Sequence, residues 1–391
     1  MSPLNNPRTA EEYWKLGKEF ADKENFQESL YHFTEAIQLD PAGAEIYLSR
    51  GGTYYSLKQY NEAVKDFDKA QELGLVSLAL YIRRGVTYRM LNQPTKAIED
   101  YNLAYQLAPQ DLAVYVNRGN AYADLGDFQK AIEDFTKSIE IDPNVLMFYN
   151  LRGNAYGKIK QYRRAMEDYS HAIELNPKGI SALVNRGLTY YHLKLYEEAI
   201  RDYDRVIEID PSDEGAYSSR GSAYSASGKY EEAVADFKKA LELNPNDPAI
   251  YNNLGNAFVA LKQSQQAIQN YGEAIRINPH YLDGYYNRGN TYFALQKYQE
   301  AIEDFSKAIQ INPKDFRSYH NRACVYQALN QLTEAIQDFN KTIELSPGLA
   351  VAYLNRGRTY KTMGDKEAAR LDFQQAAELG LGAGEGELRK L

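Results

Sequence analysis

A period of 34 residues constrains this chain more than any other feature of its sequence. We number the positions of the period so that a recurring glycine is repeat position 8. Eleven repeats then cover residues 10–383 with no insertion or deletion, and Ala323 fills the one gap in the glycine series. The glycines are Gly17, Gly51, Gly85, Gly119, Gly153, Gly187, Gly221, Gly255, Gly289 and Gly357.

Two helical faces are visible in every repeat. Positions 4, 8 and 11 share one face, and positions 20, 24 and 27 share another. Positions 11 and 24 are always Tyr or Phe, position 4 is Tyr in ten repeats, and position 20 is Ala in ten. A turn at positions 15–16 separates the two helices, and Pro at position 32 ends the second helix in nine repeats. One helix pair cannot bury its own apolar stripe, so neighbouring pairs must stack, which predicts an all-α fold.

This pattern of aromatic, Gly, Ala and Pro positions resembles the tetratricopeptide repeat family over about 95% of the chain. The resemblance implies antiparallel helix pairs stacked into a right-handed superhelical solenoid with a concave groove. We therefore expect a disordered N-terminal segment (residues 1–9), one solenoid of eleven repeats (residues 10–383) and a short C-terminal tail (residues 384–391). No solvating helix is expected after the last repeat, although terminal repeats usually need a polar cap.

Three local signals refine this architecture. Thr9 and Glu12 have the spacing of a capping box at the start of the first helix. Pro94 at position 17 indicates a stiffer turn or a capped second helix in the third repeat. Gly74 replaces the usual Asp-Pro or Asn-Pro at the end of the second repeat, and a glycine helix stop predicts a differently bent junction there.

A charged pair is predicted inside most repeats. Position 7 is Arg in nine repeats and position 23 is Asp in nine, and the exceptions fall in the same two repeats. The first repeat has Leu16 and His32, and the eighth has Leu254 and Asn270. Helix geometry places positions 7 and 23 on the same side of the apolar stripe. We predict a bidentate, partly buried Arg–Asp pair that fixes how the two helices dock.

Asparagine gathers at positions 6 and 9, on the side of the first helix that faces away from the core. Asn is a mediocre helix residue, and we expect no demand from folding for it there. The family resemblance places this face in the concave groove, where side-chain amides suit the backbone of an extended peptide. The alternative is a set of inherited, solvated polar residues. The residues are Asn117, Asn120, Asn154, Asn185, Asn253, Asn256, Asn287, Asn290, Asn321 and Asn355.

The same face is basic near the N-terminus. Lys15, Lys18, Arg83 and Arg89 occupy positions 6, 9, 6 and 12 of the first and third repeats, which makes them a candidate site for an acidic peptide or a carboxylate. Solvated surface charge is the alternative. The Lys and Asn pattern with which some members of the family bind chaperone tails is not found in register, so that partner is not favoured.

Composition narrows the function classes. A net charge of −8 argues against nucleic acid as the main partner. No P-loop, GxSxG or metal-ligand spacing occurs, so neither catalysis nor a cofactor nor a metal is expected. The single cysteine, Cys324, has no visible base partner and is expected to be inert. No secretory signal and no apolar run long enough to span a membrane is present, which predicts a cytoplasmic protein.

These observations predict a non-catalytic protein-interaction scaffold. It would bind an extended peptide or partner segment in the groove, mainly through the fourth to eleventh repeats. The alternative is a structural protein that self-associates through its solenoid ends, the C-terminal end in particular, or through its groove.

Overall fold

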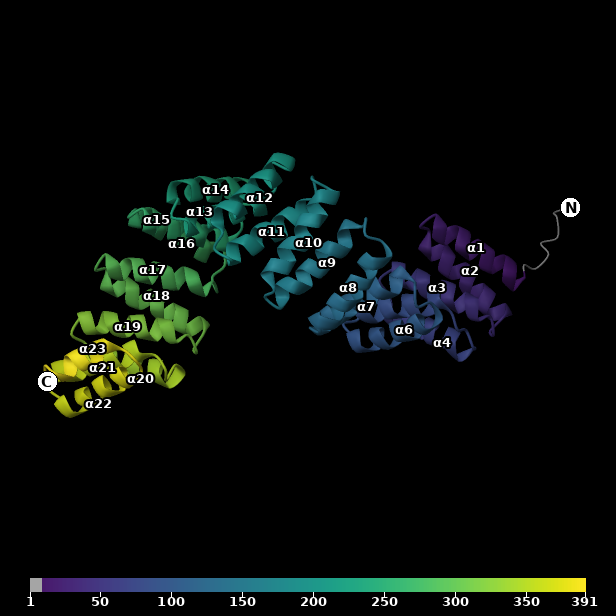
Figure 1. The fold of residues 1–391 in the computed structure, drawn as a ribbon. Coiled ribbons are helices and arrows are strands. Elements are labelled where there is room, and N and C mark those ends of the chain that lie inside the picture. Colours follow the sequence, from purple (N-terminus) through teal and green to yellow (C-terminus); the bar gives the residue numbers. More distant parts are fainter. Residues whose placement is uncertain (1–8) are drawn as a thin grey trace. The chain divides into compact units, whose positions relative to one another are not determined.

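The computed structural model describes residues 9–391, so the expected disorder of residues 1–9 lies outside the described residues except at Thr9. The described elements are α-helices (Figure 1). Eleven are first helices of a repeat: α1 (Ala10–Asp22), α3 (Ala44–Ser56), α5 (Leu78–Met90), α7 (Leu112–Leu125), α9 (Leu146–Lys158), α11 (Ile180–His192), α13 (Glu214–Ala226), α15 (Pro248–Ala260), α17 (Leu282–Ala294), α19 (Phe316–Ala328) and α21 (Ala350–Met363).

The second helices alternate with these. They are α2 (Phe26–Leu39), α4 (Tyr60–Glu72), α6 (Pro94–Leu107), α8 (Phe128–Ile141), α10 (Tyr162–Leu175), α12 (Tyr196–Ile209), α14 (Tyr230–Leu243), α16 (Ser264–Ile277), α18 (Tyr298–Ile311), α20 (Leu332–Leu345) and α22 (Lys366–Glu378). Every first helix begins at repeat position 1 and every second helix at position 17. The predicted helix pairs are therefore confirmed.

The turn between the two helices has one conformation throughout. Position 15 is left-handed in all eleven repeats, and it is Gly in only three of them. The others place residues such as Lys160 (φ 60°) there, at a cost that Gly would avoid. Pro94 is the first residue of α6, where its missing N–H costs nothing. Thr9 and Glu12 form the predicted capping box.

Position 8 is small because an aromatic ring packs directly against it. A Cβ atom on Gly119 would lie 2.7 Å from the ring of Phe135, at position 24 of the same repeat. The ring is buried, as are the small residues around it such as Ala131. The same contact occurs in the other repeats with Gly at position 8 whose contacts are described, and it sets the distance between the two helices.

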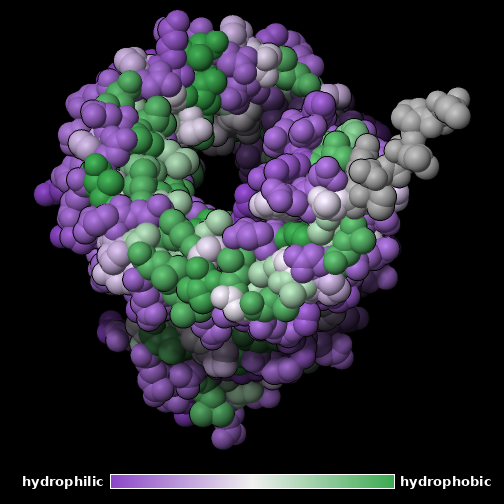
Figure 2. All heavy atoms as spheres, turned by 90° about the vertical axis from the view of Figure 1, so that its right-hand side faces the viewer, coloured by the Kyte–Doolittle hydropathy of each residue, from purple (hydrophilic) through white to green (hydrophobic). Residues whose placement is uncertain are grey.

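The chain divides into two compact parts, Met1–Thr189 and Tyr190–Leu391, which we call the N-terminal half and the C-terminal half. Within each half, the second helix of one repeat packs against the first helix of the next. First helices of successive repeats also contact one another, as α15, α17, α19 and α21 do, and form one wall. A single solenoid across residues 10–383 stays a prediction. Figure 2 shows hydrophobic residues set among hydrophilic ones on the visible surface.

The expectation that no helix follows the last repeat is wrong. Residues beyond α22 form a short helix, α23 (Gly382–Leu388), which packs against α22. Leu381, Leu388 and Leu391 lie against the buried cluster around Phe373. Glu387 accepts hydrogen bonds from the side chains of α21, which fasten the helix to the last repeat. The apolar end of the C-terminal half is therefore covered by the chain itself.

Candidate functional site

The predicted Arg–Asp pair is present within the repeats. In the fourth repeat, Nε and Nη2 of Arg118 donate to Oδ2 and Oδ1 of Asp134 at 2.9 and 2.8 Å. The two side chains are only 15% and 7% exposed, and the hydrogen bond to Asp134 raises the pKa of Arg118. The same bidentate geometry occurs in Arg50–Asp66, Arg84–Asp100, Arg152–Asp168, Arg220–Asp236, Arg288–Asp304, Arg322–Asp338 and Arg356–Asp372.

Tyrosine rings enclose this pair. The guanidinium of Arg322 lies 5.8 Å from the ring centroids of both Tyr319 and Tyr326, which occupy positions 4 and 11 of its own helix. The two rings and the carboxylate of Asp338 therefore contact the same guanidinium. Cation–π attraction is strongest for a desolvated cation such as this one. This arrangement accounts for the tyrosines at positions 4 and 11, which the sequence assigned only to the core.

Eight of the nine arginines at position 7 also reach the preceding repeat, and the exception is Arg288, which faces Gly272. Nη1 of Arg322 donates to Oγ of Ser306 at 2.8 Å, and Ser306 lies at position 25 of the repeat before. The pair therefore docks repeats onto one another as well as helices within a repeat. The other contacts of this kind are Arg50–Thr34, Arg84–Asp68, Arg118–Asn102, Arg152–Thr136, Arg186–Ser170, Arg220–Asp204 and Arg356–Asn340.

Asparagines at position 6 connect the first helices of the C-terminal half. Nδ2 of Asn321 donates to Oη of Tyr286 at 3.1 Å and to Oδ1 of Asn290 at 2.7 Å, so it lies between positions 5 and 9 of the preceding repeat. Nδ2 of Asn287 donates in the same way to Oδ1 of the buried Asn252, at 2.9 Å. The expectation that folding makes no use of these asparagines is therefore wrong.

Asn355 makes the corresponding contacts to positions 5 and 9 of the preceding repeat, at longer distances. Its Nδ2 lies 3.5 Å from Nε2 of His320 and 3.7 Å from Sγ of Cys324. Burial raises the pKa of the Cys324 thiol to about 11, so the thiol stays protonated and unreactive at neutral pH. Burial also lowers the pKa of His320, whose ring contacts Phe339.

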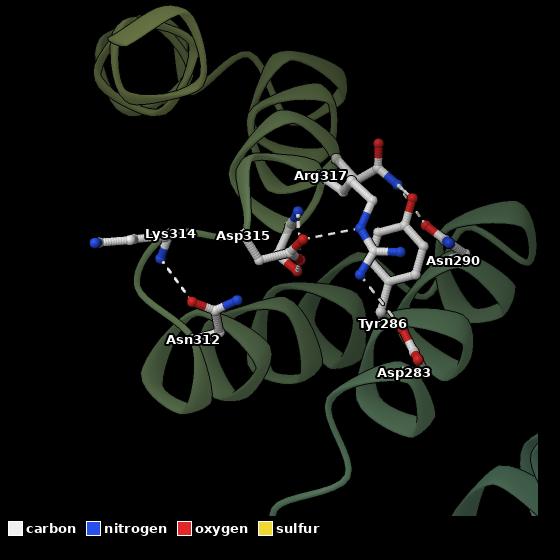
Figure 3. Close-up of polar contacts among 9 residues, drawn as sticks. Asp283, Tyr286, Asn290, Asn312, Lys314, Asp315 and Arg317 are labelled. Carbon is white, nitrogen blue, oxygen red and sulfur yellow. Dashed lines mark hydrogen bonds and ion pairs between the residues drawn. The ribbon is translucent and has the colours of Figure 1, made fainter. Parts of the chain in front are cut away.

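Charged residues frame the row of asparagines in the C-terminal half (Figure 3). The guanidinium of Arg317 lies over the ring of Tyr286, 4.8 Å from its centroid. Nε of Arg317 donates to Asp315 at 2.8 Å, and Nη2 donates to Asp283 at 3.3 Å. Arg317 therefore bridges the first helices α17 and α19 at the edge of the same surface. Sequence reasoning missed this arginine, although position 2 lies on the face that it assigned to the groove.

The remaining predicted asparagines include one contact of the same kind in the N-terminal half, from Asn185 at position 6 to Asn154 at position 9 of the preceding repeat, and several contacts of other kinds. Asn117 donates back to the carbonyl oxygen of Ala113 in its own helix. Oδ1 of Asn154 accepts from Asn185 at 3.1 Å and from the hydroxyl of Tyr169 at 2.7 Å. Asn256 likewise accepts from the hydroxyl of Tyr271. Asn120 and Asn253 are half-buried on the same face.

The structure separates the four basic residues of the N-terminal half. Lys15 forms an exposed ion pair with Glu11, and Arg89 pairs with Asp124. Lys18 and Arg83, in contrast, line one pocket of about 480 Å³ between α1, α3 and α5. Two of the four predicted residues therefore share a site.

No helix among residues 9–391 combines the length and the apolar character needed to cross a lipid bilayer. Within the same residues, no three His, Cys, Asp or Glu side chains lie close enough together to hold a metal ion.

Several known structures share this fold. A tetratricopeptide repeat protein from Parabacteroides merdae is 20% identical, with a TM-score of 0.51, and the match covers 65% of this chain and 97% of that one. Yeast Tom70 is 16% identical, with a TM-score of 0.50, and the match covers 96% of this chain and 93% of that one. At these identities the likeness shows the fold alone. No curated protein matches the chain in sequence.

Matches to the tetratricopeptide repeat family are spread over most of the chain. They cover residues 17–58, 221–262 and 255–296 as "TPR repeat" and residues 44–73, 78–111, 113–145, 147–178, 180–213, 282–315, 305–337 and 350–379 as "Tetratricopeptide repeat". The period, the helix pairs and these matches agree: the chain belongs to the tetratricopeptide repeat family.

Proposed function

We propose that the chain is a non-catalytic scaffold whose first helices bind an extended segment of a partner protein, chiefly in the C-terminal half. The family and the fold support a protein-interaction scaffold in general. The narrower proposal depends on one observation, the row of amides at position 6 on the wall of α17, α19 and α21.

The contacts of this row leave its acceptor groups available. A side-chain amide has two N–H donors and one oxygen acceptor. Both donors of Asn321 are used within the protein, while its oxygen accepts no hydrogen bond from the described residues. Because the donors are held by the preceding first helix, the oxygen has a fixed orientation before any partner arrives. Pre-organisation of this kind reduces the entropy cost of binding.

An extended chain offers complementary groups. Its backbone N–H groups do not bond to one another, so they can donate to a series of fixed oxygens. The half-buried position of Asn287, Asn321 and Asn355 shields such bonds from water. The neighbouring Tyr286 and Arg317 add an aromatic surface and a cation beside the row.

A pull-down with the full chain tests this proposal. Replacing Asn287, Asn290 and Asn321 with Ala together is expected to reduce capture of the partner at least about tenfold, because each lost bond contributes about 1 kcal/mol. The matched control replaces Gln266, Gln299 and Gln310, exposed amides on α16 and α18, with Ala. Circular dichroism verifies that both variants are folded. Equal capture by the two variants would remove the binding assignment.

Self-assembly through the C-terminal end is the second predicted function. The cover that α23 places over the last repeat gives this function no support from the structure. Sedimentation velocity at several concentrations tests it, since self-association raises the sedimentation coefficient as the concentration rises.

A further inference from the structure

We propose that the pocket between α1, α3 and α5 binds a bulky apolar side chain of a partner peptide that carries an acidic residue beside it. This inference rests on the proposed function, partner binding to the first-helix wall, but it concerns the other half of the chain. Nothing in the pocket depends on the asparagines of the C-terminal half.

The floor of the pocket is apolar. Phe26, Phe33 and Phe67 line it together with Ile82 and Val86. A volume of about 480 Å³ lies within the usual range of ligand sites, which is roughly 300–1,000 Å³. A large aromatic or aliphatic side chain buried there would lose its contact with water, and such anchors carry most of the binding free energy at protein interfaces.

The rim of the pocket favours an anion. The hydroxyl group of Ser49 donates to the carbonyl oxygen of Glu45, and that of Ser56 donates to the carbonyl oxygen of Gly52. Ser49 also accepts from Nε1 of Trp14. Both hydroxyl hydrogens are therefore used within α3, which leaves Lys18 and Arg83 as the donors available to a ligand at the rim.

Two cations supply the donors that remain at the rim. Lys18 and Arg83 are exposed, and no carboxylate among residues 9–391 forms an ion pair with either. Lys18 lies over the Trp14 ring, 4.5 Å from its centroid, which holds the ammonium group beside the opening. Gly52 makes room for the other cation, because a Cβ atom there would lie 3.0 Å from Nη1 of Arg83.

One acidic residue, Asp22, also lines the pocket and is exposed. The two cations outnumber it, so the local charge is positive in a chain whose net charge is negative. A carboxylate at this rim would be attracted to both cations and would gain a charge-assisted hydrogen bond from the one that it contacts. Asp22 lowers the affinity for such a ligand, so its removal is expected to strengthen binding.

A random peptide library displayed on phage tests the proposal against the immobilised full chain. The expected consensus combines one large apolar residue with a neighbouring Asp or Glu. Its enrichment should be lost with the double variant Lys18→Glu and Arg83→Glu. The control variant, Lys65→Glu with Lys137→Glu, makes the same change in net charge on the exposed surfaces of α4 and α8 and should keep the enrichment.

Fluorescence anisotropy with the consensus peptide then measures the affinity. We expect the Lys18/Arg83 variant to bind the peptide with an affinity at least about tenfold lower than that of the wild type. Asp22→Asn should raise the affinity about threefold. Replacing the apolar residue of the peptide with Ala should also abolish binding. Decanoate, a free amphiphile with a carboxylate, should not displace the peptide at concentrations below its micelle range.

Four outcomes would overturn the proposal: no enrichment that depends on Lys18 and Arg83, a consensus without an acidic residue, equal affinity of the Ala peptide, or displacement by decanoate. The triple asparagine variant separates this test from the test of the proposed function. It should bind the consensus peptide with unchanged affinity, because its changes all lie in the C-terminal half.

Discussion

The eighth and tenth repeats lie in the same half of the chain. Their two helices are joined by different contacts, apolar in the eighth repeat and ionic in the tenth. The tenth buries a charged pair, Arg322 with Asp338. The eighth replaces Arg with Leu254, which is 3% exposed, and its position 11 is Phe258 instead of Tyr. Well-packed apolar residues can replace a buried ion pair without loss of stability. The comparison indicates that the pair determines how repeats join rather than whether they fold.

Position 25 of the preceding repeat also differs between the tenth and the eighth repeat. Position 25 before the tenth repeat is Ser306, which accepts a hydrogen bond from Arg322. Position 25 before the eighth repeat is Lys238, which lies over the ring of Phe258 and would repel an arginine. Four positions therefore change together in the eighth repeat: positions 7, 11 and 23 of the repeat itself and position 25 of the repeat before it.

The largest expected effect comes from placing an arginine in the eighth repeat, where the apolar Leu254 replaces it. Leu254→Arg would bury a guanidinium without a carboxylate and close to Lys238, at a cost of about 4 kcal/mol. Adding Asn270→Asp and Lys238→Ser should restore most of that stability. Urea denaturation of the full chain measures the change, and hydrogen exchange in α14–α16 localises it, since repeat arrays need not unfold as one unit. A triple variant no more stable than the single one would break the comparison.

The converse change removes the charge from the tenth repeat. Arg322→Leu leaves Asp338 buried and unpaired, and we expect a loss of about 3 kcal/mol. Arg322→Leu with Asp338→Asn reproduces the residues of the eighth repeat and should lose less than about 1 kcal/mol. The same denaturation series measures both variants. Equal losses would show that an unpaired Asp338 carries no penalty, which would contradict a buried ion pair.

A smaller effect concerns the bond between repeats. Arg288 has Gly272 at position 25 before it, so it lacks the contact that Arg322 makes, and a Cβ atom on Gly272 would lie 3.7 Å from its Nη1. Gly272→Ser should stabilise the protein by about 1 kcal/mol more than Gly272→Ala, which supplies only the gain in helix propensity. Calorimetry measures the difference. Identical melting temperatures for the two variants would argue against a role for position 25.

The smallest effect depends on pH and on position 5, where the eighth repeat has Asn252 and the tenth has His320. Burial lowers the pKa of His320, so below about pH 6.5 the unfolded chain binds more protons than the folded chain. Stability therefore falls as the pH falls. His320→Gln should reduce the loss between about pH 7 and about pH 5.5 by about 1 kcal/mol or less. A pH profile identical to that of the wild type would contradict this.

Much of the fold follows from the sequence alone. The 34-residue period determines where each helix begins, and the shared exceptions at positions 7 and 23 identify the Arg–Asp pair. The contact that eight of the arginines make to the preceding repeat was missed because position 25 varies among Thr34, Asp68, Asn102 and other residues that share only an acceptor atom. One signal was available in the sequence. Position 25 is Lys238 in the repeat before Leu254, where no arginine needs an acceptor.

The candidate sites were harder to predict. Periodicity places Asn321 on the inner face, but only the packing of α17 against α19 shows that its two donors are already used. The pocket of Lys18 and Arg83 depends on three helices and on the missing side chain of Gly52. Such sites arise from distances between repeats, which a pattern within one repeat does not contain.

Site-specific photo-crosslinking tests the binding wall most directly. A photoreactive phenylalanine analogue replaces either Arg317, on the wall of α19, or Leu371, which is 62% exposed on α22. We predict that the analogue at position 317 gives a discrete crosslinked partner and that the Asn287→Ala, Asn321→Ala background suppresses this product. Equal crosslinking from position 371, or a product from position 317 that persists in that background, would contradict binding along the first helices.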